Sequence, residues 1–172
     1  PNVVIQFEDF QNTHAFELLK RWQDKIPCFN DDIQGTASVS VTGLYSAMRV
    51  KGEKLSEQRV LFLGAGSAAT GIAHLIADAM AEEGLPREEA LKRIALVDSK
   101  GMVSSRRADT LAANKLPFAH DLPLAGNLLD AVKVFKPTAI IGVSAQPKTF
   151  TKEVIEEMSA LNERPIIFAL SN

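Results

Sequence analysis

Short apolar runs alternate along the chain with longer stretches in which apolar residues recur at helical spacing. The short runs predict strands at residues 3–7, 59–63, 94–97, 139–143 and 166–170. The longer stretches predict helices at residues 13–25, 36–50, 67–82, 87–92, 126–135 and 151–161. From residue 59 onward this alternation is typical of a parallel sheet with helices on both of its faces. The predicted fold class is therefore α/β, with a Rossmann-like, doubly wound parallel sheet.

The part before residue 59 predicts a short strand and two helices ahead of this sheet. Residues 3–7 predict a buried strand. The spacing of Phe16, Leu19 and Trp22 predicts a helix with Trp22 in its apolar core. The following helix is small and apolar, and residues four positions apart predict its closely packed face: Val39, Gly43 and Ala47. Residues 51–58 are polar and predict a linker into the sheet.

The composition is that of a globular domain with a sizeable core: 172 residues, 46% hydrophobic and 23% charged. The net charge of −2 gives no reason to expect nucleic acid or a membrane as a partner, and no apolar run approaches the ~20 residues of a membrane span. A single cysteine, Cys28, suits a reducing compartment, so an intracellular location in the cytoplasm or an organelle matrix is expected. Because strand-like runs lie at both ends, we expect the chain to be cut from a longer one.

A glycine-rich turn follows the predicted strand 59–63 and leads into a helix. It has the form Gly64-x-Gly66-x-x-Ala69. The first glycine permits a tight turn, the second lets the backbone approach a pyrophosphate, and Ala69 keeps helix and strand close. Helix N-termini favour anions, so the turn predicts dinucleotide binding by residues 64–68: Gly64, Ala65, Gly66, Ser67 and Ala68. A purely structural tight turn is the alternative.

Asp98 ends the next predicted strand, where an acidic residue usually contacts the adenosine ribose. It lies further from the glycines than the usual ~20 residues, which the long intervening helix and the turn around Pro86 explain. A polar and basic group follows it: Ser99, Lys100, Arg106, Arg107 and Lys115. Cations at this position suit a 2′-phosphate and favour NADP over NAD. A solvated basic loop would have the same composition, and NAD stays an alternative.

Two acidic pairs lie near the ends of apolar segments. Glu8 and Asp9 form the first pair, and Asp31 and Asp32 form the second. Hard carboxylate oxygens suit Mg²⁺ or Mn²⁺, and the sequence has no cysteine–histidine pattern for zinc. From spacing alone, a helix cap is an equal alternative, since Asp31 or Asp32 could cap the helix that begins near Thr36.

Together these residues resemble the malic enzyme family, over the whole length of the chain. The resemblance rests on several blocks in the same order: Ile5-Gln6-Phe7-Glu8-Asp9-Phe10, Phe29-Asn30-Asp31-Asp32-Ile33-Gln34-Gly35-Thr36-Ala37, Leu61-Phe62-Leu63-Gly64-Ala65-Gly66, Val97-Asp98-Ser99-Lys100-Gly101, Lys136-Pro137-Thr138, Ile141-Gly142-Val143 and Arg164-Pro165-Ile166-Ile167-Phe168-Ala169-Leu170-Ser171-Asn172.

The resemblance implies a role for each matching residue. Metal ligands would be Glu8, Asp9 and Asp32, and Asp31 would support a catalytic lysine. The cofactor would be contacted by the glycine turn, by Val143 and, at the ribose, by Asp98. Three residues match the NADP-preferring branch: Ser99, Lys100 and Lys115. Asn172 would lie at the substrate and nicotinamide end.

The implied reaction is the oxidative decarboxylation of L-malate to pyruvate and CO₂ with reduction of NADP⁺. The family's catalytic tyrosine and lysine would lie upstream of Pro1, since Tyr45 does not match, so the chain alone is expected to be inactive. The resemblance implies residues 1–50 as a metal-binding segment joining domains and residues 51–172 as the NAD(P)-binding domain. A homo-oligomer, dimer or tetramer, is expected. Two alternatives stay open: a non-catalytic dinucleotide-binding module, and a domain of another hydroxy- or amino-acid dehydrogenase.

Overall fold

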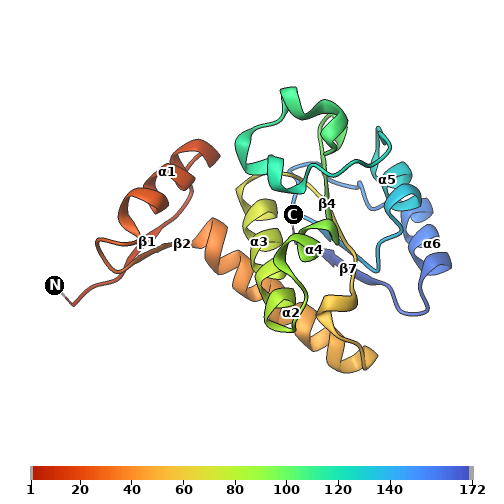
Figure 1. Cartoon of the computed structure of the whole chain (residues 1–172), viewed down its shortest axis with the longest axis horizontal. Coiled ribbons are helices and arrows are strands. Elements are labelled where there is room, and N and C mark those ends of the chain that lie inside the picture. Colours follow the sequence, from red (N-terminus) through yellow and green to blue (C-terminus); the bar gives the residue numbers. More distant parts are fainter. Residues whose placement is uncertain (1, 171–172) are drawn as a thin grey trace.

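A computed structural model describes residues 2–170 of the chain (Figure 1). Its α-helices are α1 (Asn12–Trp22), α2 (Thr36–Lys51), α3 (Ser67–Glu82), α4 (Arg87–Lys92), α5 (Leu128–Phe135) and α6 (Lys152–Leu161). Its strands are β1 (Ile5–Phe7), β2 (Cys28–Asn30), β3 (Val60–Leu63), β4 (Ile94–Asp98), β5 (Gly101–Met102), β6 (Ala139–Gly142) and β7 (Ile166–Ala169). Short helical turns cover Asp31–Gly35, Leu55–Glu57, Ser105–Thr110 and Ala113–Phe118.

The main sheet has five strands in the order β5-β4-β3-β6-β7. Four of them are parallel, with Val60 opposite both Ile94 and Ala139. From β3 the chain crosses to β4 on one side and later to β6 on the other. The carboxyl ends of β3 and β6 therefore form the switch point at which open α/β sheets bind ligands. The predicted α/β fold class is confirmed.

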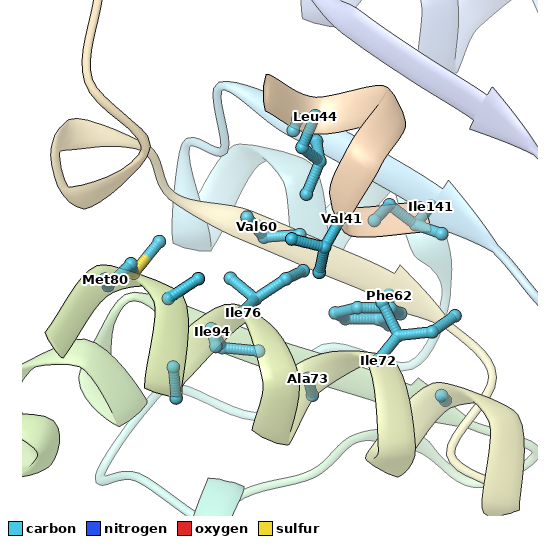
Figure 2. Close-up of a cluster of buried hydrophobic side chains, with 14 of the residues drawn as sticks. Val41, Leu44, Val60, Phe62, Ile72, Ala73, Ile76, Met80, Ile94 and Ile141 are labelled. Carbon is cyan, nitrogen blue, oxygen red and sulfur yellow. The ribbon is translucent and has the colours of Figure 1, made fainter. Parts of the chain in front are cut away.

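Alternate residues of the buried strands point into two separate cores. Val60 and Phe62 of β3 face a core shared with α2, α3 and α4, of which Figure 2 shows the central side chains. Leu61 and Leu63 face the opposite core beneath α5 and α6. All four positions of β3 are buried, as expected for a parallel strand covered on both faces. The two helical layers hold the glycine turn rigidly at the end of β3.

The segment before α2 forms a small unit beside the main sheet (Figure 1). Strands β1 and β2 pair in parallel, and α1 packs through Ala15 and Leu19 against Ile33. The turn at residues 31–35 lies directly on α3. A Cβ at Gly71 of α3 would lie 2.6 Å from the Ile33 carbonyl oxygen. The small unit is thus fixed to the helix that follows the glycine turn.

Two predictions about this small unit were wrong. The first strand is exposed: Val4 is 69% exposed and Ile5 41%. A two-stranded sheet has no second layer to cover it. Trp22 is half-buried and lies between two cations, with the Arg21 Cζ and Lys25 Nζ atoms 5.4 and 5.5 Å from its ring centroid.

The packed face of α2 differs in part from its prediction. Gly43 does allow close packing, since a Cβ there would lie 3.1 Å from the ring of Phe168 in β7. Val39, however, is 74% exposed. A spacing of four residues drifts by about 40° per step around a helix of 3.6 residues per turn. The buried face instead follows mixed spacing: Ala37, Ser40, Val41, Leu44 and Met48. These side chains pack into the core of the main sheet.

Strand β5 was not predicted. It has two residues and pairs antiparallel with β4, Asp98 lying opposite Gly101, so the sheet is mixed. Two residues are too short to carry a hydrophobic period. The chain reverses at Ser99 and Lys100, and Gly101, which has a φ of +100°, begins the strand.

Candidate functional site

A cavity of about 650 Å³ opens at the switch point, beside the carboxyl ends of β3, β4 and β6. Its lining comes from the glycine turn, the end of β4, residues 112–115, the loop after β6 and one residue of α1: Leu63, Gly64, Ala65, Gly66, Val97, Asp98, Ser99, Ala112, Asn114, Lys115, Val143, Ser144, Ala145, Gln146 and Phe16. This volume lies within the ~300–1,000 Å³ of small-molecule and cofactor sites.

Gly64 is held between two strands at the edge of the cavity. Its N–H donates to the Val97 carbonyl at 2.8 Å, and the Val143 N–H donates to the Leu63 carbonyl at 2.9 Å. The φ of Gly64 is +119°, and a Cβ would lie 2.6 Å from the Val143 carbonyl oxygen. Only glycine fits this conformation and this close approach.

The rest of the turn begins α3. Gly66 is the N-cap residue, and the Thr70 hydroxyl donates to its carbonyl at 3.0 Å. Ala69 is fully buried in the core, as the predicted close packing of helix and strand requires. Gly64, Ala65 and Gly66 line the cavity, whereas Ser67 and Ala68 belong to the first turn of α3.

Asp98 lies at the centre of a charged cluster at the carboxyl end of β4, where it lines the cavity. Its Oδ2 accepts from the Lys115 ammonium at 2.7 Å, and its Oδ1 accepts from the Arg107 guanidinium at 2.7 Å. The Lys100 backbone N–H also donates to Oδ1, at 2.9 Å. Burial alone would raise the pKa of Asp98, but the hydrogen bonds from Lys115 and Arg107 outweigh it and hold the pKa below its ordinary value.

The cations predicted around the ribose position are largely paired within the protein. Lys115 lines the cavity, but its ammonium is already paired with the carboxylate of Asp98. The remaining cations do not gather at the cavity: Arg106 pairs with Asp121 at 2.9 Å and the exposed Lys100 does not line it. Ser99 lines the cavity as a neighbour of Asp98.

A second site lies in the small unit, where two acidic pairs follow paired strands. Phe7 of β1 lies opposite Asn30 of β2, so Glu8 and Asp9 leave the sheet at the same edge as Asp31 and Asp32. One carboxylate oxygen from each of Glu8, Asp9 and Asp32 lies within 4.8 Å of the others. The three carboxylates therefore converge as expected, although 23 positions separate Asp9 from Asp32.

The local backbone holds this cluster together. Asp9 has a φ of +58°, and its N–H donates to Asp32 Oδ2 at 3.0 Å. The Gln6 amide donates to Glu8 Oε2 at 2.7 Å. A non-glycine residue at positive φ is uncommon and tends to mark a functional position. Within residues 2–170 no lysine or arginine pairs with the three acids, so their negative charge is uncompensated by protein.

Helix capping does not explain the second acidic pair. The cap is Asn30, whose Oδ1 accepts from the Ile33 N–H at 3.0 Å. Asp31 and Asp32 follow Asn30 in the chain and belong to the first turn of the π-helical segment that leads into α2. The carboxylate of Asp31 covers the Cα of Gly35, and a side chain at Gly35 would collide with it. Asn172, expected at the nicotinamide end, lies outside the described residues.

Comparison with known proteins defines the relationship. The profile of a family described as "Malic enzyme, NAD binding domain" matches residues 33–172. The chain belongs to the malic enzyme family. It is 54% identical over 171 residues to the NADP-dependent malic enzyme of Sus scrofa, covering 99% of this chain and 30% of that protein. It is 52% identical to the chloroplastic NADP-dependent malic enzyme of Flaveria trinervia, covering 99% and 26%.

Solved malic enzyme structures share the fold. The malic enzyme of Entamoeba histolytica matches with a TM-score of 0.79 at 28% identity, covering 98% of this chain and 34% of that one. The NAD-dependent malic enzyme of Thermotoga maritima matches with a TM-score of 0.78 at 30% identity, covering 98% and 42%. The chain thus spans about a third of the length of the malic enzymes it matches, and its residues 33–172 match the model of their NAD-binding domain.

Two features of this malic enzyme domain were not assigned from the sequence. The sequence analysis named Arg107 only as one of several cations and did not predict its ion pair with Asp98. The sequence signal for this pair is that Arg107 follows the strand-ending acid Asp98 closely along the chain. Phe16 of α1 lines the cavity at the switch point, so the acid-bearing unit contributes to the lining of this cavity. In the described part of the chain, no helix is both long enough and apolar enough to cross a membrane.

Proposed function

We propose that this chain provides the dinucleotide cavity and the metal-binding acids of an NADP-dependent malic enzyme. The overall reaction is L-malate plus NADP⁺ giving pyruvate, CO₂ and NADPH. The convergence of Glu8, Asp9 and Asp32 carries the proposal, because a dinucleotide-binding module has no need of three converging carboxylates without a cationic partner. The malic enzymes most similar in sequence are named NADP-dependent, which supports the cofactor.

The donor set fits a hard divalent cation. Three carboxylates offer the oxygen ligands that Mg²⁺ and Mn²⁺ prefer. They would leave the remaining coordination positions open for substrate oxygens. A bound divalent cation would supply Lewis-acid chemistry at this site. Glu8, Asp9 and Asp32 would hold it. Asp31 would orient the lysine that takes the hydroxyl proton.

The cavity supplies cofactor binding and orientation. The turn at residues 64–66 and the N-terminus of α3 would hold the pyrophosphate, since free N–H groups and the helix dipole favour an anion there. Val143 directly follows β6 and lines the cavity, and it would border the nicotinamide side. Lys115 and Ser99 would face the 2′-phosphate, with Lys100 nearby as proposed from the sequence.

Metal binding is tested on the chain itself by electron paramagnetic resonance with Mn²⁺ alone. The wild type should bind one Mn²⁺, because three carboxylates meet. Asp32→Asn should weaken that binding by at least about tenfold, since one charged ligand of three is lost. Asp24→Asn is the matched control, because Asp24 lies outside the cluster. Equal binding by wild type and Asp32→Asn contradicts the metal assignment.

The reaction is tested in a chimera in which this chain replaces the matching 171-residue segment of the Sus scrofa enzyme. We expect L-malate-dependent reduction of NADP⁺, followed at 340 nm, with pyruvate as product. The 172-residue chain alone should give no turnover, because its one tyrosine, Tyr45, lies within α2 away from both sites. A folded chimera that binds NADP⁺ without oxidising malate would instead support a non-catalytic module. Homo-oligomerisation and the intracellular compartment stay predictions.

A further inference from the structure

Two arginines lie at the amino edge of the main sheet, at the opposite end of the strands from the cofactor cavity. Arg59 directly precedes β3, and Arg93 directly precedes β4. The two strands pair in parallel with Val60 opposite Ile94, and the Val60 N–H donates to the Arg93 carbonyl at 2.8 Å. Because both strands begin at this edge, their parallel pairing brings the two arginines together. The cavity lies at the carboxyl ends of the same strands.

Backbone carbonyl groups hold both guanidinium groups in place. The Nε and Nη2 atoms of Arg59 donate to the Phe135 carbonyl at 3.1 and 2.7 Å, and the guanidinium lies over the Phe135 ring, 4.3 Å from its centroid. The Nη1 atom of Arg93 donates to the Glu57 carbonyl at 3.3 Å. A guanidinium has more N–H donors than these bonds use. A carbonyl carries no net charge, so these bonds fix the two side chains without neutralising them.

The two positive charges have no carboxylate partner, although both arginines are half-buried. Within residues 2–170, neither Arg59 nor Arg93 takes part in an ion pair. The side chain of Glu57, which is close to Arg59 in the chain, instead accepts from the Lys54 N–H at 3.0 Å. Burial lowers the pKa of Arg59, and the nearby charge of Arg93 lowers it further. Because a guanidinium keeps its proton in proteins, this repulsion persists until an anion binds.

We propose that Arg59 and Arg93 form a binding site for a phosphate group at the amino edge of the sheet. A phosphate dianion would neutralise both guanidinium groups, and their planar N–H forks match its oxygens. Lys133 and Lys136, at the end of α5, also form no ion pair within the described part of the chain, and they add to the positive potential. The ligand would join the beginnings of β3 and β4 and leave the cofactor cavity open, so the site does not depend on the proposed function.

NMR of the arginine side chains tests the site on the chain itself. The Nε–H signals of Arg59 and Arg93 should shift on addition of inorganic phosphate and reach saturation. Arg87 is the internal control, because its Nε already donates to Asp78 at 2.7 Å, and its signal should not shift. Potassium chloride at the same ionic strength should shift neither of the first two signals. Shifts of the same size with chloride, or no shift with phosphate, overturn the inference.

Two variants separate a specific site from a general attraction of anions to this edge. In Arg93→Gln, phosphate binding followed through the Arg59 signal should weaken by roughly tenfold or more, since a charge-assisted contact is lost. Lys92→Gln is the matched control, because it removes the neighbouring charge, which is exposed and pairs with Glu89 at 2.7 Å. It should change phosphate binding by less than about twofold. An equal loss in both variants overturns the site. Arg59 is left unchanged because it also holds the end of α5.

Further titrations identify the source of the phosphate group and its place in the molecule. A lower dissociation constant for phenyl phosphate than for inorganic phosphate assigns the site to a phosphate monoester, and the reverse assigns it to the free ion. Arg93→Gln should leave the dissociation constant of NADP⁺ unchanged, because Arg93 does not line the cofactor cavity. A matching loss of NADP⁺ binding would place the phosphate at that cavity and overturn a separate site. If Arg93→Gln does not fold by circular dichroism, the wild-type titration decides alone.

Discussion

Gly64→Ala is expected to damage both the stability of the domain and its cofactor cavity. The substitution places a methyl group 2.6 Å from the Val143 carbonyl oxygen and 2.9 Å from its carbonyl carbon. These neighbours are backbone atoms, and they cannot rotate away. The hydrogen bonds from Gly64 to Val97 and from Val143 to Leu63 fix both strands in the sheet. Relief therefore requires β3 and β6 to separate at the switch point.

Two terms determine the size of the effect. A side chain at a φ of +119° is strained, and strain of this kind costs about 1–3 kcal/mol. Overpacking against immobile atoms costs a further ~1–3 kcal/mol. The free energy of unfolding should fall by about 2–6 kcal/mol in all, a large part of the ~5–15 kcal/mol that stabilises a typical domain. Because Val143 and Ser144 line the cavity, their displacement should also weaken NADP⁺ binding by more than about tenfold.

Urea unfolding of the chain followed by circular dichroism measures the first effect, and calorimetric titration with NADP⁺ measures the second. Gly84→Ala is the matched control. Gly84 has a φ of +97°, but nothing lies within 4 Å of its Cβ position, so this variant reports the strain alone. The difference between the two variants then isolates the clash at the switch point. If Gly64→Ala lowers the free energy of unfolding no more than Gly84→Ala does, the close approach of Gly64 to the Val143 backbone is refuted.

The other predictions concern the Asp98 cluster. Lys115→Gln should raise the KM for NADP⁺ in the chimera by roughly tenfold, ~1.4 kcal/mol, and leave the KM for NAD⁺ nearly unchanged, because only NADP⁺ has a 2′-phosphate; equal loss for both would make Lys115 structural. The pKa of Asp98 is lowered in the folded state, so its contribution to stability is present above its ordinary pKa of about 3.8 and is lost as pH falls through the lower folded value. The difference in urea midpoint between wild type and Asp98→Asn should therefore shrink between pH 5 and pH 2–3, and a pH-independent difference would contradict the ion pairs.

Local signals placed most of the main domain from the sequence. The predicted bounds of the helices at 67–82 and 87–92 coincide with α3 and α4. The reason is that strong breakers flank them, the glycine turn on one side and Gly84, Leu85 and Pro86 between them. Strands β3, β4, β6 and β7 were also placed to within a residue or so, because buried parallel strands are continuous apolar runs between such breakers.

Structural features that depend on packing against a neighbouring layer could not be predicted from the sequence in the same way. Val39 and Val4 are apolar, yet both are exposed, because burial depends on whether another element covers the residue. Strand β5 forms only because the chain reverses at Ser99 and Lys100 and returns beside β4.

The sequence by itself determined which chemical groups the two sites contain: the glycine turn, the strand-ending acid with its cations, and the two acidic pairs. These groups can be recognised because each lies within a few residues of a strand or helix end. The tertiary structure decided how they combine. Parallel pairing of β1 with β2 brings Glu8 and Asp9 to Asp32, and the folding of residues 98–115 gives Asp98 both Arg107 and Lys115 as partners. Contacts between distant residues depend on strand register and on the loop path, and neither is encoded in local periodicity.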